Sequence, residues 1–153
     1  MATLRDAFQA WVEADPVVQA QLTGGIFDAS EMDYGGESAS QAPREPEPDG
    51  VTIIPHAVIR WRGSGEYPPY RVGSERETVE VYVYQDTDYS IIDAVVNSLR
   101  LRQHNDGFGT YLEADDRALA HLNFAQISGE IPAEELGYTP CRFIRFYFIQ
   151  VRK

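Results

Sequence analysis

Three histidines and one cysteine are the side chains of this sequence best suited to bind a metal or to act as a base or a nucleophile. His56, His104 and His121 do not stand at metal-ligand spacing with another histidine, cysteine or acid. Cys141 begins a run of strand-forming residues, and no base occupies a position typical of thiol activation. We therefore expect structural or surface roles for the histidines and a small buried apolar role for Cys141. The sequence predicts no catalytic residue and no cofactor.

Two further patterns are candidates for ligand binding. Gly63-Ser64-Gly65 has the flexibility of a phosphate-binding loop, but the G-x-x-x-x-G-K-[ST] pattern is absent and no helix follows that could bind a phosphate at its N-terminus. Glu113, Asp115 and Asp116 could bind calcium weakly, but they lack the loop pattern of an EF-hand. We expect a hairpin loop at the first position and a solvated turn at the second, so the sequence predicts no metal site.

The charge of the chain is negative and uneven. The formal net charge is −11 and the isoelectric point is about 4.6, which argues against binding of nucleic acid or of an anionic membrane over the whole surface. Positions 28–49 hold seven acids and one base, Arg44, and so carry −6 of the total; the acids are Asp28, Glu31, Asp33, Glu37, Glu45, Glu47 and Asp49. Lys153 is the only lysine. This arginine bias reflects either the coding composition or the use of arginine at interfaces, where it forms bidentate pairs and stacks on aromatic rings.

The stretch 77–103 changes from a strand pattern to a helix pattern. Three valines alternate with Glu80, Tyr82 and Tyr84, which predicts a half-buried strand with one aromatic, polar-tipped face. That face could stack on a base or a sugar, but the acidic charge argues against nucleic acid and favours a packing surface. Thr87-Asp88 offers an N-cap for a following helix. The apolar residues of this helix are Ile91, Ile92, Val95, Val96 and Leu99.

The remaining elements predict an α+β fold. A first helix capped by Thr3 ends before Asp15-Pro16, which starts a short second helix, and residues 26–28 form a short strand. Strands are predicted over 51–62, with Pro55 indicating a bulge or an edge, over 119–128 and over 141–152. The last strand is apolar on both faces, which suits either a central strand or a subunit contact. We expect an antiparallel-leaning mixed β-sheet with helices packed on one face.

Two segments are predicted to make contacts with other chains. Residues 31–50 are rich in acids, proline, glycine and serine, cannot fold by burial alone, and are expected to form an extended arm on a neighbouring subunit. Residues 63–76 are expected to form a long hairpin loop for docking, stiffened by Pro68-Pro69. With two residues of the last strand, the predicted interface residues are Glu31, Tyr34, Arg44, Tyr67, Tyr70, Arg71, Arg76, Arg145 and Tyr147.

No targeting or membrane segment is predicted. The N-terminus lacks the basic and apolar regions of a signal peptide, and no apolar run has the length needed to cross a bilayer. Because Cys141 is the only cysteine, no intrachain disulfide can form. We expect a single cytoplasmic domain over 1–153, of a size that buries a substantial core.

In order and spacing, most of the chain resembles the tail terminator, or tail completion, proteins of long-tailed bacteriophages. The resemblance rests on an N-terminal helix ending at Ala14-Asp15-Pro16, the strand Gly24-Gly25-Ile26-Phe27-Asp28, the strand Glu80-Val81-Tyr82-Val83-Tyr84 with the helix Ile91-Ile92-Asp93-Ala94-Val95, and the closing strand Arg142-Phe143-Ile144-Arg145-Phe146-Tyr147-Phe148. These motifs encode packing and not chemistry.

The resemblance implies a structural protein of the virion neck, assembled in the host cytoplasm. It implies a homo-hexameric ring that caps the tail tube, stops its polymerisation and joins the tail to a head-closure or stopper protein. DNA would pass through the lumen without specific binding, and an acidic lumen would keep that passage non-adhesive because it repels phosphates. Two alternatives stay open: another head–tail connector, such as the head-closure or stopper protein itself, and a small ligand-binding regulatory α+β domain.

Overall fold

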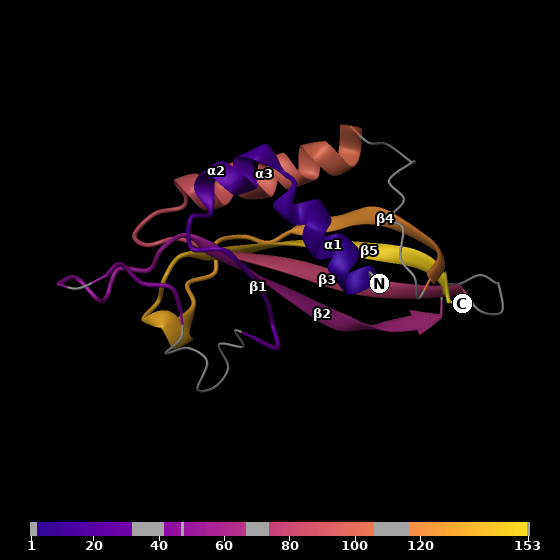
Figure 1. The fold of residues 1–153 in the computed structure, drawn as a ribbon, viewed down its shortest axis with the longest axis horizontal. Helices are drawn as coiled ribbons and strands as arrows, with labels where there is room; N and C mark the ends of the chain where they lie inside the picture. Colours follow the sequence, from indigo (N-terminus) through magenta and orange to yellow (C-terminus); the bar gives the residue numbers. More distant parts are fainter. Residues whose placement is uncertain (1–2, 32–41, 47, 67–73, 106–116, 153) are drawn as a thin grey trace.

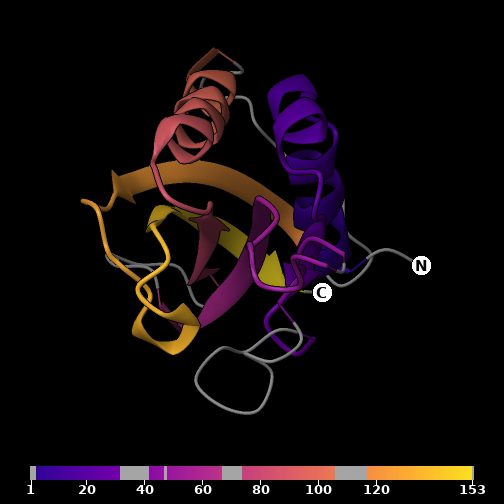
Figure 2. The same cartoon turned by 90° about the vertical axis from the view of Figure 1, so that its left-hand side faces the viewer.

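The computed structural model describes residues 3–31, 42–46, 48–66, 74–105 and 117–152. Within them the fold is α+β, as the sequence predicts: a mixed five-stranded sheet carries its α-helices on one face (Figures 1 and 2). The elements are α1 (Leu4–Glu13), α2 (Pro16–Gln21), β1 (Ile26–Asp28), β2 (His56–Glu66), β3 (Ser74–Tyr84), α3 (Ser90–Asn105), β4 (Arg117–Ile127), the 3₁₀ turn η3 (Glu134–Leu136) and β5 (Cys141–Arg152). No helix of the described residues is long and apolar enough to span a membrane.

The strand order is β1-β2-β3-β5-β4. The short β1 runs parallel to β2, and the other pairs are antiparallel. The last strand, β5, lies in the interior of the sheet between β3 and β4. Of the two explanations for its apolar residues on both faces, the central strand is therefore confirmed.

The main core lies between the helices and the sheet, and Phe8 of α1 is at its centre. The Phe8 ring is fully buried and lies 5.8–6.0 Å from the rings of Trp11, Trp61, Phe146 and Phe148. Three of these four contacts are edge-to-face, the arrangement favoured by the ring quadrupole. The buried side of α1 consists of Leu4, Phe8, Trp11 and Val12, and it places Phe8 over β2 and β5.

The first two helices begin where the sequence places them. Thr3 and Asp6 form a capping box on α1. Asp15 caps α2 by accepting hydrogen bonds from the backbone N–H groups of Val17 and Val18, with Pro16 in the first helical turn. The Asp15 carboxylate is buried, and both of its oxygens also accept from Ser98 Oγ of α3 at 3.0 Å. Asp15 therefore caps α2 at its junction with α1 and links this junction to α3 by hydrogen bonds.

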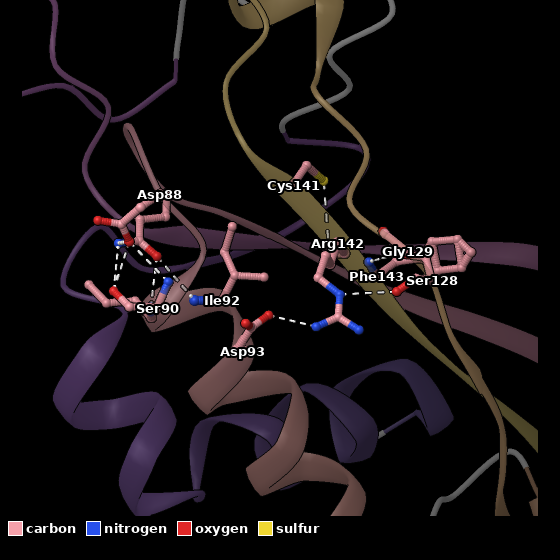
Figure 3. Close-up of polar contacts among 11 residues, drawn as sticks. Asp88, Ser90, Ile92, Asp93, Ser128, Gly129, Cys141, Arg142 and Phe143 are labelled. Atoms are coloured by element: carbon pink, nitrogen blue, oxygen red, sulfur yellow. Dashed lines mark hydrogen bonds and ion pairs between the residues drawn. The ribbon is translucent and has the colours of Figure 1, made fainter.

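The start of α3 differs from the predicted cap at Thr87-Asp88. The helix begins at Ser90, and Thr87 has a positive φ of 68° in the tight turn before it. Asp88 accepts a hydrogen bond from the Ser90 N–H (Figure 3). The next two N–H groups of the helix, those of Ile91 and Ile92, donate to Gln85 Oε1 instead. Because Gln85 lies at the end of β3, the strand itself supplies this cap.

The start of β5 is fixed to α3 and to the end of β4 by one arginine. Arg142 pairs with Asp93 of α3 at 2.6 Å and donates from Nε to the Ser128 carbonyl at 3.0 Å (Figure 3). Ser128 Oγ in turn accepts from the backbone N–H of Phe143 at 2.9 Å. The register between β4 and β5 is therefore held by side chains as well as by the ladder.

Two predicted boundaries in the β2–β3 hairpin are wrong. The strand predicted over 51–62 begins at His56, so Pro55 precedes the strand and leaves its hydrogen bonds intact. The loop predicted over 63–76 is shorter, because β2 continues to Glu66 and β3 starts at Ser74. The glycines do not end the pairing of β2 with β3. The register shifts at a bulge between Trp61 and Gly63, where Gly63 has a φ of 110°, and the pairing then continues.

The second face of the sheet is covered at one end, where the aromatic face of β3 is the packing surface that the sequence favours. Residues 42–46 and 48–54 and the η3 region pack there, and Tyr84 is buried beneath them. Figure 1 shows both segments at the left-hand end of the sheet, where β5 begins. The small core that they complete consists of Ala42, Ile53, Val58, Tyr84, Ala133, Leu136 and Cys141.

Part of the predicted arm 31–50 packs on this chain's own sheet. Arg44 forms an antiparallel bridge with Ile53, and the N–H of Glu45 donates to the Thr52 carbonyl at 2.8 Å. Residues 42–46 and 48–54 therefore form a hairpin, which Ala42 and Ile53 anchor in the second core. Residues 32–41 of the arm lie outside the described residues.

Candidate functional site: an arginine groove on the open sheet face

The other end of the second face carries a polar groove among the described residues. Strand alternation sends Val79 and Val81 of β3 into the helix-side core and turns Thr78, Glu80 and Tyr82 to the opposite side. The groove encloses about 400 Å³ and is lined by Arg62, Arg76, Thr78, Glu80, Tyr82 and Arg145. We call this set the arginine groove.

A buried carboxylate is at the centre of the arginine groove. The side chain of Glu80 is 1% exposed and binds one arginine with each oxygen. Arg62 Nε donates to Oε1, while Arg145 donates to Oε2 from Nε at 2.8 Å and from Nη2 at 2.5 Å. A buried charge is costly unless it is paired in this way. Arg145 Nη1 also donates to Gln126 Oε1 at 2.9 Å, so the guanidinium is held on three sides.

Register and a bulge together bring the two arginines to Glu80. Arg145 of β5 lies directly opposite Glu80 in the antiparallel pair. Arg62 is the extra residue of the β2 bulge between Trp61 and Gly63, and it has no partner in the regular pairing. Strand alternation puts Arg62 on the same face as Val58 and Arg60, and the bulge leaves it beside the Glu80 carboxylate.

Tyr82 closes one side of the arginine groove. Its hydroxyl accepts from Arg62 Nη2 at 2.7 Å, and the Arg60 and Arg62 guanidinium carbons lie 4.9 and 5.6 Å from its ring centroid. Partial burial raises the pKa of Tyr82 above its usual value of 10, so the hydroxyl stays protonated at neutral pH. The hydrogen bond from Arg62 to Glu80 raises the pKa of Arg62, which keeps that guanidinium charged.

Arg76 stands at the open rim of the groove. Its guanidinium carbon lies 4.2 Å from the ring centroid of Tyr147 on β5, a stacked cation–π contact. Arg76 is exposed, and among the described residues it forms no ion pair. Its fork of N–H donors therefore faces solvent and is available to an acidic partner.

The structure brings together three of the nine predicted interface residues: Arg76, Arg145 and Tyr147. Glu31 and Arg44 lie elsewhere, the first accepting from the Asp28 N–H after β1 and the second in the hairpin 42–54. Tyr34, Tyr67, Tyr70 and Arg71 fall outside the described residues.

Sequence reasoning missed Arg62, Glu80 and Tyr82 as parts of this site. A glycine directly after Arg62 is a bulge signal, and an acid among the valines of β3 needs a basic partner once that strand is central. These two signals indicate an ion pair between Arg62 and Glu80, but only when the strand register is known.

His56 and Cys141 have structural roles in this fold. His56 is fully buried, stacks on Tyr84 at 5.0 Å between ring centroids, and contacts the Ile54 carbonyl through Nδ1 at 2.8 Å. Burial lowers the pKa of His56 to about 4, so the ring is neutral at pH 7. Cys141 is buried in the second core, as expected. In the described part of the chain, no cluster of histidine, cysteine and acidic side chains could hold a metal ion.

A second hollow lies between α2 and α3 on the helix side. It encloses about 580 Å³, is wide open, and has Val17, Ala94 and Leu101 among its lining residues. Leu101 is one of the few large apolar side chains exposed among the described residues. Its polar lining residues are Asp15, Asn97, Ser98, Arg102 and Asn105, of which Asp15 and Ser98 are bonded to each other. A ligand-binding alternative would use this hollow.

No known protein family matches the chain, and no curated protein sequence matches it either. The fold is similar to that of a chain in the virion of a native gene transfer agent particle, with 15% sequence identity and a TM-score of 0.59. The similarity covers 99% of this chain and 96% of that chain. A second solved structure matches over 96% of this chain and 92% of its own length, with 10% identity and a TM-score of 0.46. At these identities, the first match shows a shared fold.

Proposed function

We propose that this chain is a structural protein of a phage-like virion, and specifically the ring-forming tail terminator of the neck. In this role it caps the tail tube, stops its polymerisation and joins the tail to the head. The observation that carries the proposal is the likeness to a chain of the gene transfer agent virion, which extends over nearly all of both chains. It therefore concerns the whole arrangement of helices and sheet and not a shared hairpin.

The sequence supports the same class of protein on separate grounds. The ordered motifs of the tail terminator resemblance fall on α1, β1, β3, α3 and β5, the elements that build the sheet and its helical cover. The arginine groove also supports a role in binding macromolecules. Glu80 holds Arg62 and Arg145 in place, Arg76 keeps its donors open, and arginine with tyrosine is the composition of interface hot spots.

Each predicted interface element takes a part in this proposal. Arg76, Arg145 and Tyr147 face a neighbouring subunit of a homo-hexameric ring. The tip of the β2–β3 hairpin, with Tyr67, Tyr70 and Arg71, docks on the tail tube protein or on the adjacent ring. The net charge of −11 keeps the lumen non-adhesive for DNA during its passage. No step of this role needs a catalytic group.

The test is tail assembly with the cognate tail tube protein. We expect the chain to bind tube ends as a ring and to stop growth, so that electron micrographs show capped tubes of limited length. Replacing Tyr67, Tyr70 and Arg71 together with alanine should leave the domain folded and yield uncapped, overlong tubes. If this triple variant caps tubes normally, the docking surface does not lie at the hairpin tip.

Two other results would reassign the protein. A ring found only on the portal side of the neck identifies a head-closure protein. A monomer that binds neither tubes nor heads, and binds a small molecule in the hollow between α2 and α3, identifies a ligand-binding domain and contradicts the proposal.

A further inference from the structure

The hairpin 42–54 ends in a projecting acidic tip. Glu45 and Asp49 are exposed. Val51 beside them is 74% exposed, the most exposed large apolar side chain of the described residues. In Figure 1 this tip extends beyond the sheet at the left-hand end of the molecule. An exposed apolar residue among acids at a projecting tip is a feature of contact surfaces.

The tip is pre-formed. The Asp49 carboxylate accepts from the N–H of Val51 at 2.9 Å and from the N–H and hydroxyl of Thr52 at 2.8 Å each. These bonds lower the pKa of Asp49, so the turn stays charged and closed at neutral pH. Little conformational entropy is then lost when the tip binds a partner.

The arginine groove has the complementary charge and is also pre-formed. Arg62, Arg76 and Arg145 supply three positive charges against the single carboxylate of Glu80. Glu80 holds Arg62 and Arg145 in place, and Tyr147 supports Arg76. The groove thus presents a net positive, aromatic-walled surface on a chain that is acidic overall.

Tip and groove lie at opposite ends of the same sheet face. The hairpin packs where His56 pairs with Tyr84, and the groove lies where Gly63 pairs with Thr78. Six residues of strand separate His56 from Arg62, which is roughly 20 Å at strand rise. A surface with its acidic patch at one end and its basic patch at the other favours head-to-tail contacts, and such contacts close into rings or extend into filaments.

We propose that the acidic tip of the hairpin 42–54 of one copy docks into the arginine groove of the next copy. Glu45 accepts from the open donors of Arg76, and Val51 packs on the ring of Tyr147. Closure of this contact into a ring rests on the proposed function, but the contact itself does not depend on it.

The experiment measures self-association of the full chain by sedimentation velocity and native mass spectrometry at low and high salt. Arg76→Glu removes the open donor of the groove, and Glu45→Arg reverses the tip. We expect each to weaken association roughly tenfold or more, and we expect association of the unmodified chain to weaken as salt rises from about 0.05 to 0.5 M. An equimolar mixture of the two variants should associate again, because each offers the patch that the other needs.

Matched controls make the same charge changes on the helix side. Arg100 stacks on Phe124 at 4.0 Å as Arg76 stacks on Tyr147, and Glu13 is an exposed acid at the end of α1. Arg100→Glu and Glu13→Arg should leave association unchanged. Circular dichroism and thermal unfolding of all four variants verify that the fold is intact.

Three results overturn the inference: an unmodified chain that stays monomeric at every concentration and salt level, variants that associate normally, and a mixture that does not recover. The same variants separate this contact from the tail terminator role. If the chain associates through these patches but does not cap tubes, the contact is supported and the proposed function is wrong. If a variant with both patches reversed still caps tubes, the proposed function is supported and the contact is wrong.

Discussion

Glu80→Gln is the sharpest test of how the open sheet face is built. The substitution keeps the size and shape of the side chain but removes its charge and turns one acceptor oxygen into an N–H₂ donor. Glu80 accepts from Arg62 on one oxygen and from Arg145 on the other. Whichever way the amide turns, it can therefore serve only one arginine and presents a donor to the other.

The magnitude follows from the burial of each partner. A hydrogen bond to a charged group contributes about 1.5–3 kcal/mol, and breaking a fully buried ion pair costs about 3–5 kcal/mol. Here the carboxylate is buried, but the Arg62 and Arg145 side chains are 46% and 34% exposed, so water can solvate the guanidinium that loses its partner. We expect Glu80→Gln to lower the free energy of unfolding by about 2–3 kcal/mol.

The assay is urea unfolding followed by the fluorescence of Trp11 and Trp61, both of which pack in the main core. A double-mutant cycle with Arg145→Met should give a coupling energy of about 1.5–3 kcal/mol, because the second substitution removes an arginine that has already lost its partner. Asp93→Asn is the matched control: it breaks the Asp93–Arg142 pair, in which the acid is 45% exposed, and should cost less than about 1 kcal/mol.

Equal effects of Glu80→Gln and Asp93→Asn, or additive effects of the Glu80 and Arg145 substitutions, would refute this reasoning. The first result would mean that water solvates Glu80 as well as it solvates a surface acid. The second would mean that the two side chains do not act as a pair in solution.

Three further predictions concern stability elsewhere in the fold. Because the folded-state pKa of His56, about 4, lies below its usual value of 6.5, the stability that this buried neutral ring contributes is present above pH 6.5 and is lost as the pH falls to 4. His56→Gln should therefore reduce the acid-induced loss of unfolding free energy by about 3 kcal/mol, measured by urea unfolding between those two pH values. Phe8→Ala should cost about 3–5 kcal/mol by the same assay because it opens a cavity among four aromatic rings, whereas exposed Leu101→Ala should cost less than about 0.5 kcal/mol. Asp15→Ala should cost about 1–3 kcal/mol, since it removes the cap of α2 and the bonds to Ser98; Ser98→Ala in the Asp15→Ala background should then add little, and a full additional cost would contradict the linkage.

Local signals predicted the elements well. Asp15-Pro16 marks the boundary of two helices because a capping carboxylate and a fixed φ act within three residues of chain. The alternation of 143–149, apolar on both faces, suits a central strand, and β5 lies between β3 and β4. These predictions hold because their causes lie within a few residues.

The predicted strand boundaries were wrong where contacts with a distant segment of the chain determine them. Gly63-Ser64-Gly65 suggests a loop, but pairing with residues 76–78 keeps the strand intact. The alternation of β3 shows which residues share a face, but it does not say that the hairpin 42–54 covers Tyr84 and leaves Tyr82 at an open groove.

The class of fold, the order of its elements and the surplus of acid in residues 28–49 follow from the amino-acid sequence, because periodicity, capping and charge depend on neighbouring residues. The site depends on residues that are distant in the chain. Glu80 meets Arg62 and Arg145 across 18 and 65 residues of chain, through one bulge and one strand register. A shift of one residue in the pairing of β5 with β3 would turn Arg145 to the other face of the sheet, and no local pattern fixes that pairing.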